Sequence, residues 1–185
     1  MATLKLNFYT KPTLKAAKDL LGCFLVREIA GKVYKFRIVE TEAYLGEADL
    51  ASHSSKGRTK RTEIMYGRPG TAYLYLIYGM YWCLNIVAEK DGLPGAVLIR
   101  AIEPIESYVQ IGKTDGPGKL CRELSLGKSF NGHDLTLGQE LWLETGKPPK
   151  KITQTKRINV DYAGEWKDKR WRFVDPKSPC LSRKI

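Results

Sequence analysis

Residues 33–44 read VYKFRIVETEAY, and this alternation of side chains predicts a long β-strand. Successive side chains on a strand point to opposite faces, so the apolar row at positions 34, 36 and 38 shares one face. Unless a β-bulge intervenes, Glu40, Glu42 and Tyr44 continue this row toward the interior. A carboxylate on a buried face is costly unless it has a partner or a chemical task. Glu42 is therefore a candidate functional residue, and the alternatives are a solvated strand end or a Glu–Arg pair.

The residues before this strand predict a helix and a first hairpin. Thr13 is placed to cap a helix over residues 14–21, and Gly22 is placed to end it. Residues 23–29 are rich in strand-forming side chains, and Gly31-Lys32 is a plausible turn between them and the long strand.

A second hairpin is predicted from residues 71–77 and 81–89, with Tyr78-Gly79-Met80 at its tip. Glycine at the tip supplies unusual backbone angles. Large apolar side chains at a hairpin tip usually pack on a neighbouring loop. In a basic protein they can instead form a wedge that enters between base pairs.

The remaining elements indicate the fold class. Strands are expected at 96–102, 141–144, 152–160 and 171–174, and a helix is expected at 117–124. Strands and helices do not alternate regularly, so we expect an α+β fold with a largely antiparallel sheet. With 185 residues and no linker or repeat, residues 1–185 are expected to form a single domain.

The net charge of +11 favours a polyanionic partner, and nucleic acid is the first candidate. Mere solubility, a ribosomal partner or a membrane surface are the alternatives. No stretch approaches the roughly 18 apolar residues of a membrane span. The first residues lack the apolar run of a signal peptide. The four cysteines are far apart and, with two histidines, give no zinc spacing, so we expect reduced cysteines, a cytosolic protein and no metal.

The chain also lacks a P-loop, a G-x-G-x-x-G, an H-E-x-x-H and a G-x-S-x-G motif. What remains is a carboxylate with tyrosines nearby. Aromatic faces around a carboxylate suit a flat, electron-poor ring. Tyr44 shares a face with Glu42, and Tyr75 is a second candidate, whereas we interpret Tyr73 as an ordinary strand residue. A basic run after His53 could contact phosphates or form a solvated loop: Lys56, Arg58, Lys60 and Arg61.

Six collinear blocks then resemble one known family, the alkyladenine (3-methyladenine) DNA glycosylases of the mammalian type, also called methylpurine DNA glycosylases. The likeness covers residues 6–182. The blocks are VETEAYLG (39–46), SHS (52–54), PGTAYLYLIYGMYWCLN (69–85), VLIRAIEP (97–104), GPGKLC (116–121) and AGEW (163–166). The resemblance implies a curved antiparallel sheet with peripheral helices and a protruding hairpin, a fold similar to the C-terminal domain of methionyl-tRNA formyltransferases.

The resemblance also implies catalytic roles. Glu42 matches the residue that deprotonates the attacking water, and Arg100 matches the arginine that helps hold this water together with a backbone carbonyl at Ile158. Four further positions match the residues around the flipped base: Tyr44, His53 and Tyr75 enclose it, and Asn85 excludes guanine.

On the DNA side, Tyr78 matches the intercalating residue, with Met80 beside it, and Arg58 and Lys128 match backbone contacts. The family implies a monomeric base-excision enzyme that acts on duplex DNA with damaged purines, without a cofactor, a metal or a lyase step. We expect no membrane partner, and a place in the bacterial cytoplasm at the nucleoid or in a eukaryotic nucleus. The sequence departs from the family at Asn159, where glycine is common, and in a loop after His53 that is one residue shorter.

Two other hypotheses stay open at this point. A non-catalytic nucleic-acid-binding module could use the same scaffold, although it has no need of a carboxylate facing its DNA groove. A damage sensor could flip bases without turnover, and a side chain at Asn159 crowding the pocket favours this alternative.

Overall fold

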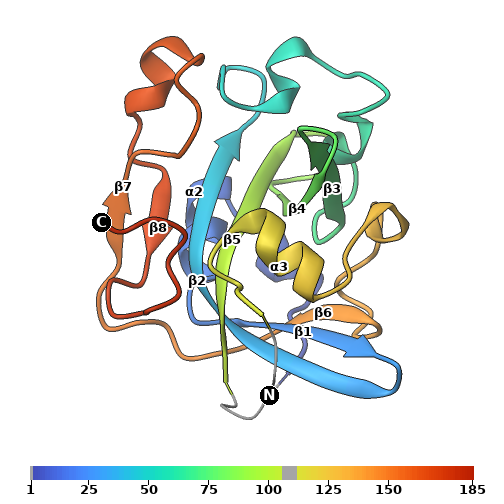
Figure 1. Ribbon diagram of the computed structural model, residues 1–185. Helices are drawn as coiled ribbons and strands as arrows, with labels where there is room; N and C mark the ends of the chain where they lie inside the picture. Colours follow the sequence, from blue (N-terminus) through green and yellow to red (C-terminus); the bar gives the residue numbers. More distant parts are fainter. Residues whose placement is uncertain (1, 106–111) are drawn as a thin grey trace.

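The computed structural model describes residues 2–105 and 112–185. Across these residues, eight strands form one antiparallel sheet in the order β3-β4-β5-β2-β1-β6, with β8 paired to β2 and β7 paired to β8 (Figure 1). The strands are β1 (Phe24–Ile29), β2 (Lys32–Leu45), β3 (Ala72–Ile77), β4 (Tyr81–Ala88), β5 (Gly95–Pro104), β6 (Leu141–Glu144), β7 (Thr153–Thr155) and β8 (Arg172–Val174). The α+β class with a largely antiparallel sheet is confirmed.

Short helices flank this sheet. The α-helices are α1 (Leu6–Tyr9), α2 (Thr13–Asp19) and α3 (Pro117–Glu123), and the 3₁₀ helices are η1 (His53–Lys56), η2 (Glu63–Tyr66), η3 (Lys128–Phe130) and η4 (Gly164–Asp168). Helix α2 packs on β2 and β5, and α3 packs on β4 and β5. In Figure 1, α3 lies in front of the strands and α2 lies behind them. The buried apolar residues of α2 and α3 belong to one core cluster with those of the sheet.

The long strand β2 organises the molecule. It pairs with β1 through its first half, with β8 through residues 40–42, and with β5 along residues 36–45. The register between β2 and β5 shifts on both sides of Glu40. This irregularity is a β-bulge, whose absence was the condition for simple alternation along the strand, and it changes which side chains face the core.

The prediction that Glu42 continues the face of Ile38 is therefore wrong. Phe36 and Ile38, which precede the register shift, have their side chains in the main core. After the shift it is Ala43 whose side chain lies in this core. Thr41 also points to this side, where its hydroxyl donates to the carbonyl of Ala17 in α2. The carboxylates of β2 consequently leave the apolar core and face the opposite side of the sheet.

The other local predictions hold with small corrections. The β1–β2 turn is Ala30-Gly31 rather than Gly31-Lys32, and both turn residues have positive φ angles, as tight hairpin turns favour. Helix α2 begins at Thr13, after Pro12, and the Thr13 hydroxyl donates to Glu89 instead of capping the helix. The helix is also shorter than expected and ends at Asp19.

Hairpin β3–β4 has the predicted tip. Ile77 pairs with Tyr81, which leaves Tyr78, Gly79 and Met80 in the turn. Tyr78 and Gly79 have φ angles of 53° and 68°, so glycine relieves one of two consecutive left-handed positions. Tyr78 and Met80 are 74% and 67% exposed, so neither packs on a neighbouring loop. The hairpin therefore presents two large apolar side chains to solvent.

The four cysteines are free thiols, and three of them are buried. In the described ranges, no helix combines the length and the apolar character needed to cross a membrane.

Candidate active site

A cavity of about 370 Å³ opens on the face of the sheet that carries Glu42. Its walls come from the end of β2, residues 51–53, residues 61 and 65, the β3–β4 hairpin, β5, the start of α3 at Pro117, and residues 158–162. Segments that are distant in the sequence thus meet around one space. The cavity lining includes most of the residues that the family resemblance singles out, and Asn159: Tyr44, His53, Tyr75, Tyr78, Asn85, Arg100, Ile158 and Asn159.

The Glu42 carboxylate is fully buried and held by three residues that line the cavity. Its Oε1 accepts a 2.8 Å hydrogen bond from the backbone N–H of Ile158. Its Oε2 accepts one of 2.8 Å from the Tyr44 hydroxyl and one of 3.2 Å from Nη1 of Arg100. An ionised carboxylate has about four acceptor sites, so one site on Oε1 is left for a further donor.

Arg100 is held between two buried carboxylates. Its Nη1 contacts Glu42, and its Nε lies 3.2 Å from Oε1 of Glu40. Glu40 is itself fully buried and also accepts bonds from Nε of Arg172 and from the backbone and hydroxyl of Ser182. The two carboxylates raise the pKa of Arg100, although its burial acts in the opposite direction. The C-terminal segment thereby fixes the far side of the Arg100 guanidinium.

The segment that carries Ile158 is anchored by a buried ion pair. Arg157 and Asp49 have fully buried side chains and form two hydrogen bonds, of 2.5 and 2.8 Å. Arg157 also donates to the carbonyls of Ala43 and Trp166. These contacts explain why the strand predicted over residues 152–160 ends at Thr155: the chain turns inward to bury Arg157.

Asn159 follows in the left-handed conformation, with φ of 58°. Asparagine is among the few residues other than glycine that adopt this conformation readily. Its side chain is consequently compatible with the local backbone and stands at the cavity wall beside Ile158.

Aromatic rings form another wall of the cavity. The rings of His53 and Tyr75 meet edge to face, with centroids 4.4 Å apart. The hydroxyl of Tyr73 lies 2.9 Å from Nδ1 of His53, and Tyr73 is almost fully buried. Tyr73 therefore positions the imidazole, so its interpretation as an ordinary strand residue was incomplete. Burial and the Arg61 charge lower the pKa of His53 from 6.5 to about 4.

Comparison with known proteins places these features in a family. A profile of the methylpurine-DNA glycosylase (MPG) family matches residues 7–179. The chain belongs to this family. Its members are DNA glycosylases, hydrolases that act on N-glycosyl bonds.

Curated relatives agree with this placement, and each carries the name "Putative 3-methyladenine DNA glycosylase". The chain is 50% identical to one from Methanocella arvoryzae over 195 residues, which covers 100% of this chain and 98% of the relative. It is 47% identical to one from Alkaliphilus oremlandii, a match that covers 98% of this chain and 99% of the relative. It is 46% identical to one from Desulfitobacterium hafniense, and this match covers 100% of both chains.

Most of the residues that the family resemblance singled out meet at the cavity. Asn85 is buried opposite Tyr73 in the β3–β4 register, and its side-chain amide donates to the Tyr73 carbonyl. Tyr78 lines the cavity from the hairpin tip, with Met80 beside it. The contact of Ile158 with Glu42 is through its N–H; its carbonyl remains a predicted water ligand.

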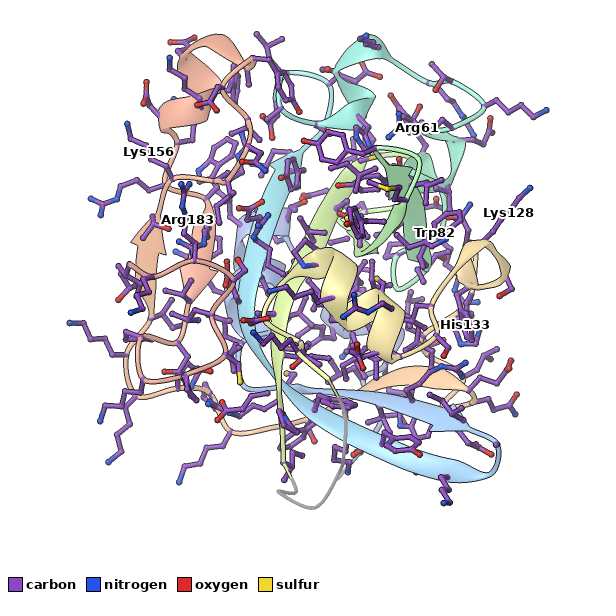
Figure 2. The ribbon with its side chains drawn as sticks, viewed as in Figure 1. Arg61, Trp82, Lys128, His133, Lys156 and Arg183 are labelled. Carbon is purple, nitrogen blue, oxygen red and sulfur yellow. The ribbon has the colours of Figure 1, made fainter. Side chains whose placement is uncertain are left out.

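The two predicted contacts with the DNA backbone lie outside the cavity lining. Arg58 is exposed and forms a 2.7 Å ion pair with Glu63. Lys128 is also exposed, and its side chain is labelled at the right-hand edge of the molecule in Figure 2. Both positions leave a cationic side chain accessible to a polyanion.

Several contributors to the site are not identified as such from sequence, among them Glu40, Tyr73 and Arg61. Glu40 and Tyr73 are two residues from Glu42 and Tyr75 on the same strands, and strand parity was the available signal. The sequence predicts that Arg61 contacts phosphate or solvent, yet it lines the cavity. Within residues 2–105 and 112–185, no group of His, Cys, Asp or Glu side chains is arranged to hold a metal ion.

Proposed function

We propose that this protein extrudes an alkylated or deaminated purine from duplex DNA and hydrolyses its N-glycosidic bond, leaving an abasic site. The observation that carries this proposal is the buried Glu42 carboxylate behind a cavity lined by aromatic rings. Family membership supports the reaction class. In this proposal residues 1–185 act as one DNA glycosylase domain.

In this mechanism Glu42 is the base that takes a proton from water. The bonds from Tyr44, Arg100 and Ile158 hold the carboxylate in place and leave an acceptor site on Oε1. Arg100 and the carbonyl of Ile158 help hold the water. The negative carboxylate also stabilises the oxocarbenium-like sugar that forms as the glycosidic bond lengthens.

Recognition of the base falls to the other cavity residues. Tyr44 and Tyr75 present aromatic rings, and His53 contacts a face of the base with its ring. Its contact with the hydrogen-bonding edge of the base is made by atoms other than the two ring nitrogens, which are already paired with Tyr73 and Arg61. Asn85 lies at the position where a clash with the exocyclic amine of guanine would exclude that base. Its side chain is held by the Tyr73 carbonyl, so it is fixed before a base enters.

Extrusion of the base falls to the hairpin tip and to exposed cations. Removing a base from a duplex costs a few kcal/mol. Tyr78, assisted by Met80, fills the gap and offsets part of this cost. Arg58 and Lys128 contact the DNA backbone. The protein binds DNA as a monomer in this proposal.

Excision of single lesions tests this function. Duplexes that carry one hypoxanthine, 1,N6-ethenoadenine or 7-methylguanine are incubated with excess protein and divided into samples with and without alkali. Since water is the nucleophile, strand breaks are expected at the lesion only after alkali. Breaks without alkali would contradict the monofunctional mechanism, and tight lesion binding without any breaks would indicate a damage sensor.

A further inference from the structure

Arg61 stands at the mouth of the cavity, although it belongs to an exposed basic loop. It lies between η1 and η2, and its guanidinium turns toward the base-binding wall (Figure 2). Its Nη2 is 3.1 Å from Nε2 of His53, and its Cζ is 5.5 Å from the centroid of the Tyr75 ring. Two of the residues proposed to contact the base are thus in contact with this cation.

The Arg61 contact determines where the proton of His53 resides. A guanidinium only donates hydrogen bonds, so Nε2 of His53 must be the acceptor. The proton of the neutral ring is then on Nδ1, which donates to the Tyr73 hydroxyl. The imidazole is uncharged, in line with its lowered pKa of about 4. The positive charge at this wall therefore comes from Arg61.

We propose that Arg61 is a specificity-determining residue that favours excision of neutral purine lesions over cationic ones. This inference rests on the proposed glycosylase function. A guanidinium has five N–H donors in a planar fork, and only one is needed for His53. The others can reach the edge of a base that lies against His53 and Tyr75.

The two lesion classes differ in how charge changes as the base departs. In both, the bond between the sugar C1′ and the base nitrogen breaks, and its electron pair goes to the base. The oxygen of water bonds to C1′, and the proton of that water goes to Glu42. A neutral base such as hypoxanthine acquires negative charge, which Arg61 stabilises by a charge-assisted hydrogen bond. A base alkylated at N7 enters as a cation, which Arg61 repels, and departs neutral.

The test compares single-turnover excision efficiency, measured with subsaturating protein, for hypoxanthine and 7-methylguanine duplexes. For Arg61→Gln we expect a fall of about tenfold or more with hypoxanthine, the size expected for one lost hydrogen bond to a charged group. With 7-methylguanine we expect an unchanged or higher efficiency. Arg61→Lys keeps the positive charge but lacks the planar fork of donors. Its excision efficiency with hypoxanthine should lie between those of wild type and Arg61→Gln.

Lys60→Gln is the matched control, because it removes the same charge from an exposed neighbour that does not line the cavity. Lys60→Gln should change the excision efficiency of both lesions by the same factor, so the ratio of the two efficiencies stays unchanged. An equal loss on both lesions for Arg61→Gln would overturn the inference and indicate a simple phosphate contact. A wild-type protein that excises neither lesion would instead overturn the proposed function itself.

Discussion

The hydroxyl of Tyr44 donates a 2.8 Å hydrogen bond to Oε2 of Glu42, two residues earlier on β2. The two side chains share a face of the strand, so the backbone itself brings the donor to the acceptor. Burial raises the pKa of Tyr44 well above its ordinary value, and the Glu42 charge adds to this effect. The hydroxyl therefore keeps its proton and remains a donor, while the ring lines the cavity.

Replacing Tyr44 by phenylalanine separates these two roles. Tyr44→Phe keeps the aromatic ring and removes a hydrogen bond to a charged group, which contributes about 1.5–3 kcal/mol. We expect the single-turnover excision rate to fall about ten- to hundredfold, with little change in the Kd for lesion DNA. An equal loss in Tyr44→Phe and Tyr44→Ala would show that the hydroxyl has no separate role.

The buried pair of Asp49 and Arg157 should be important for stability. Asp49→Asn leaves a fully buried guanidinium without its counter-charge, so the free energy of unfolding should drop by about 3–5 kcal/mol. Urea unfolding followed by circular dichroism measures this change. The exposed Lys156–Asp168 pair provides the control, since Asp168→Asn should leave the denaturation midpoint unchanged. Equal midpoints for the two variants would contradict the anchoring role of Asp49.

The pKa of His53 can be observed directly, because the chain has only two histidines. NMR titration should give His53 a midpoint near pH 4, and His53→Gln assigns the signal. Below the ordinary value of 6.5, the unfolded chain binds a proton that the folded protein does not. Wild type should therefore lose stability relative to His53→Gln as the pH falls from 6.5 toward 4. A midpoint between 6 and 7 would show that the ring is neither buried nor next to a cation.

Tyr78 should affect DNA distortion without affecting folding. Because it is 74% exposed, Tyr78→Ser should leave the thermal midpoint unchanged. We expect the affinity for lesion DNA and the single-turnover excision rate each to fall about tenfold. The reason is that no aromatic ring then fills the gap that the extruded base leaves in the duplex. Val33→Ser removes an exposed apolar side chain from the β1–β2 hairpin and should match wild type. If Tyr78→Ser bound and excised the lesion as wild type does, Tyr78 would not be the side chain that enters the duplex.

Several elements could be predicted because their signals are local. The hairpin tip at Tyr78-Gly79-Met80 follows from two strand-like runs around a glycine, and the structure confirms it. The class of the sheet follows from the order of the elements. Turn chemistry and strand propensity act over a few residues, so sequence reasoning captures them.

The face of Glu42 could not be predicted, because the bulge around Glu40 depends on strands far away in the chain. Glu40 pairs with Ala101 of β5 and Val174 of β8, and its carboxylate is satisfied by Arg172 and Ser182. Such long-range partners leave no local pattern. The inward turn after Thr155 has the same origin, since it depends on the distant Asp49.

The excision rate of Glu42→Gln tests the central claim most directly. Single-turnover cleavage of a hypoxanthine duplex, developed with alkali, is measured beside the Kd for the same duplex. A general base contributes about 10²–10⁴-fold, so the variant should lose at least a hundredfold in rate and still bind lesion DNA. A Glu42→Gln variant that excises hypoxanthine at the wild-type single-turnover rate would contradict the role of Glu42 as the base that activates water.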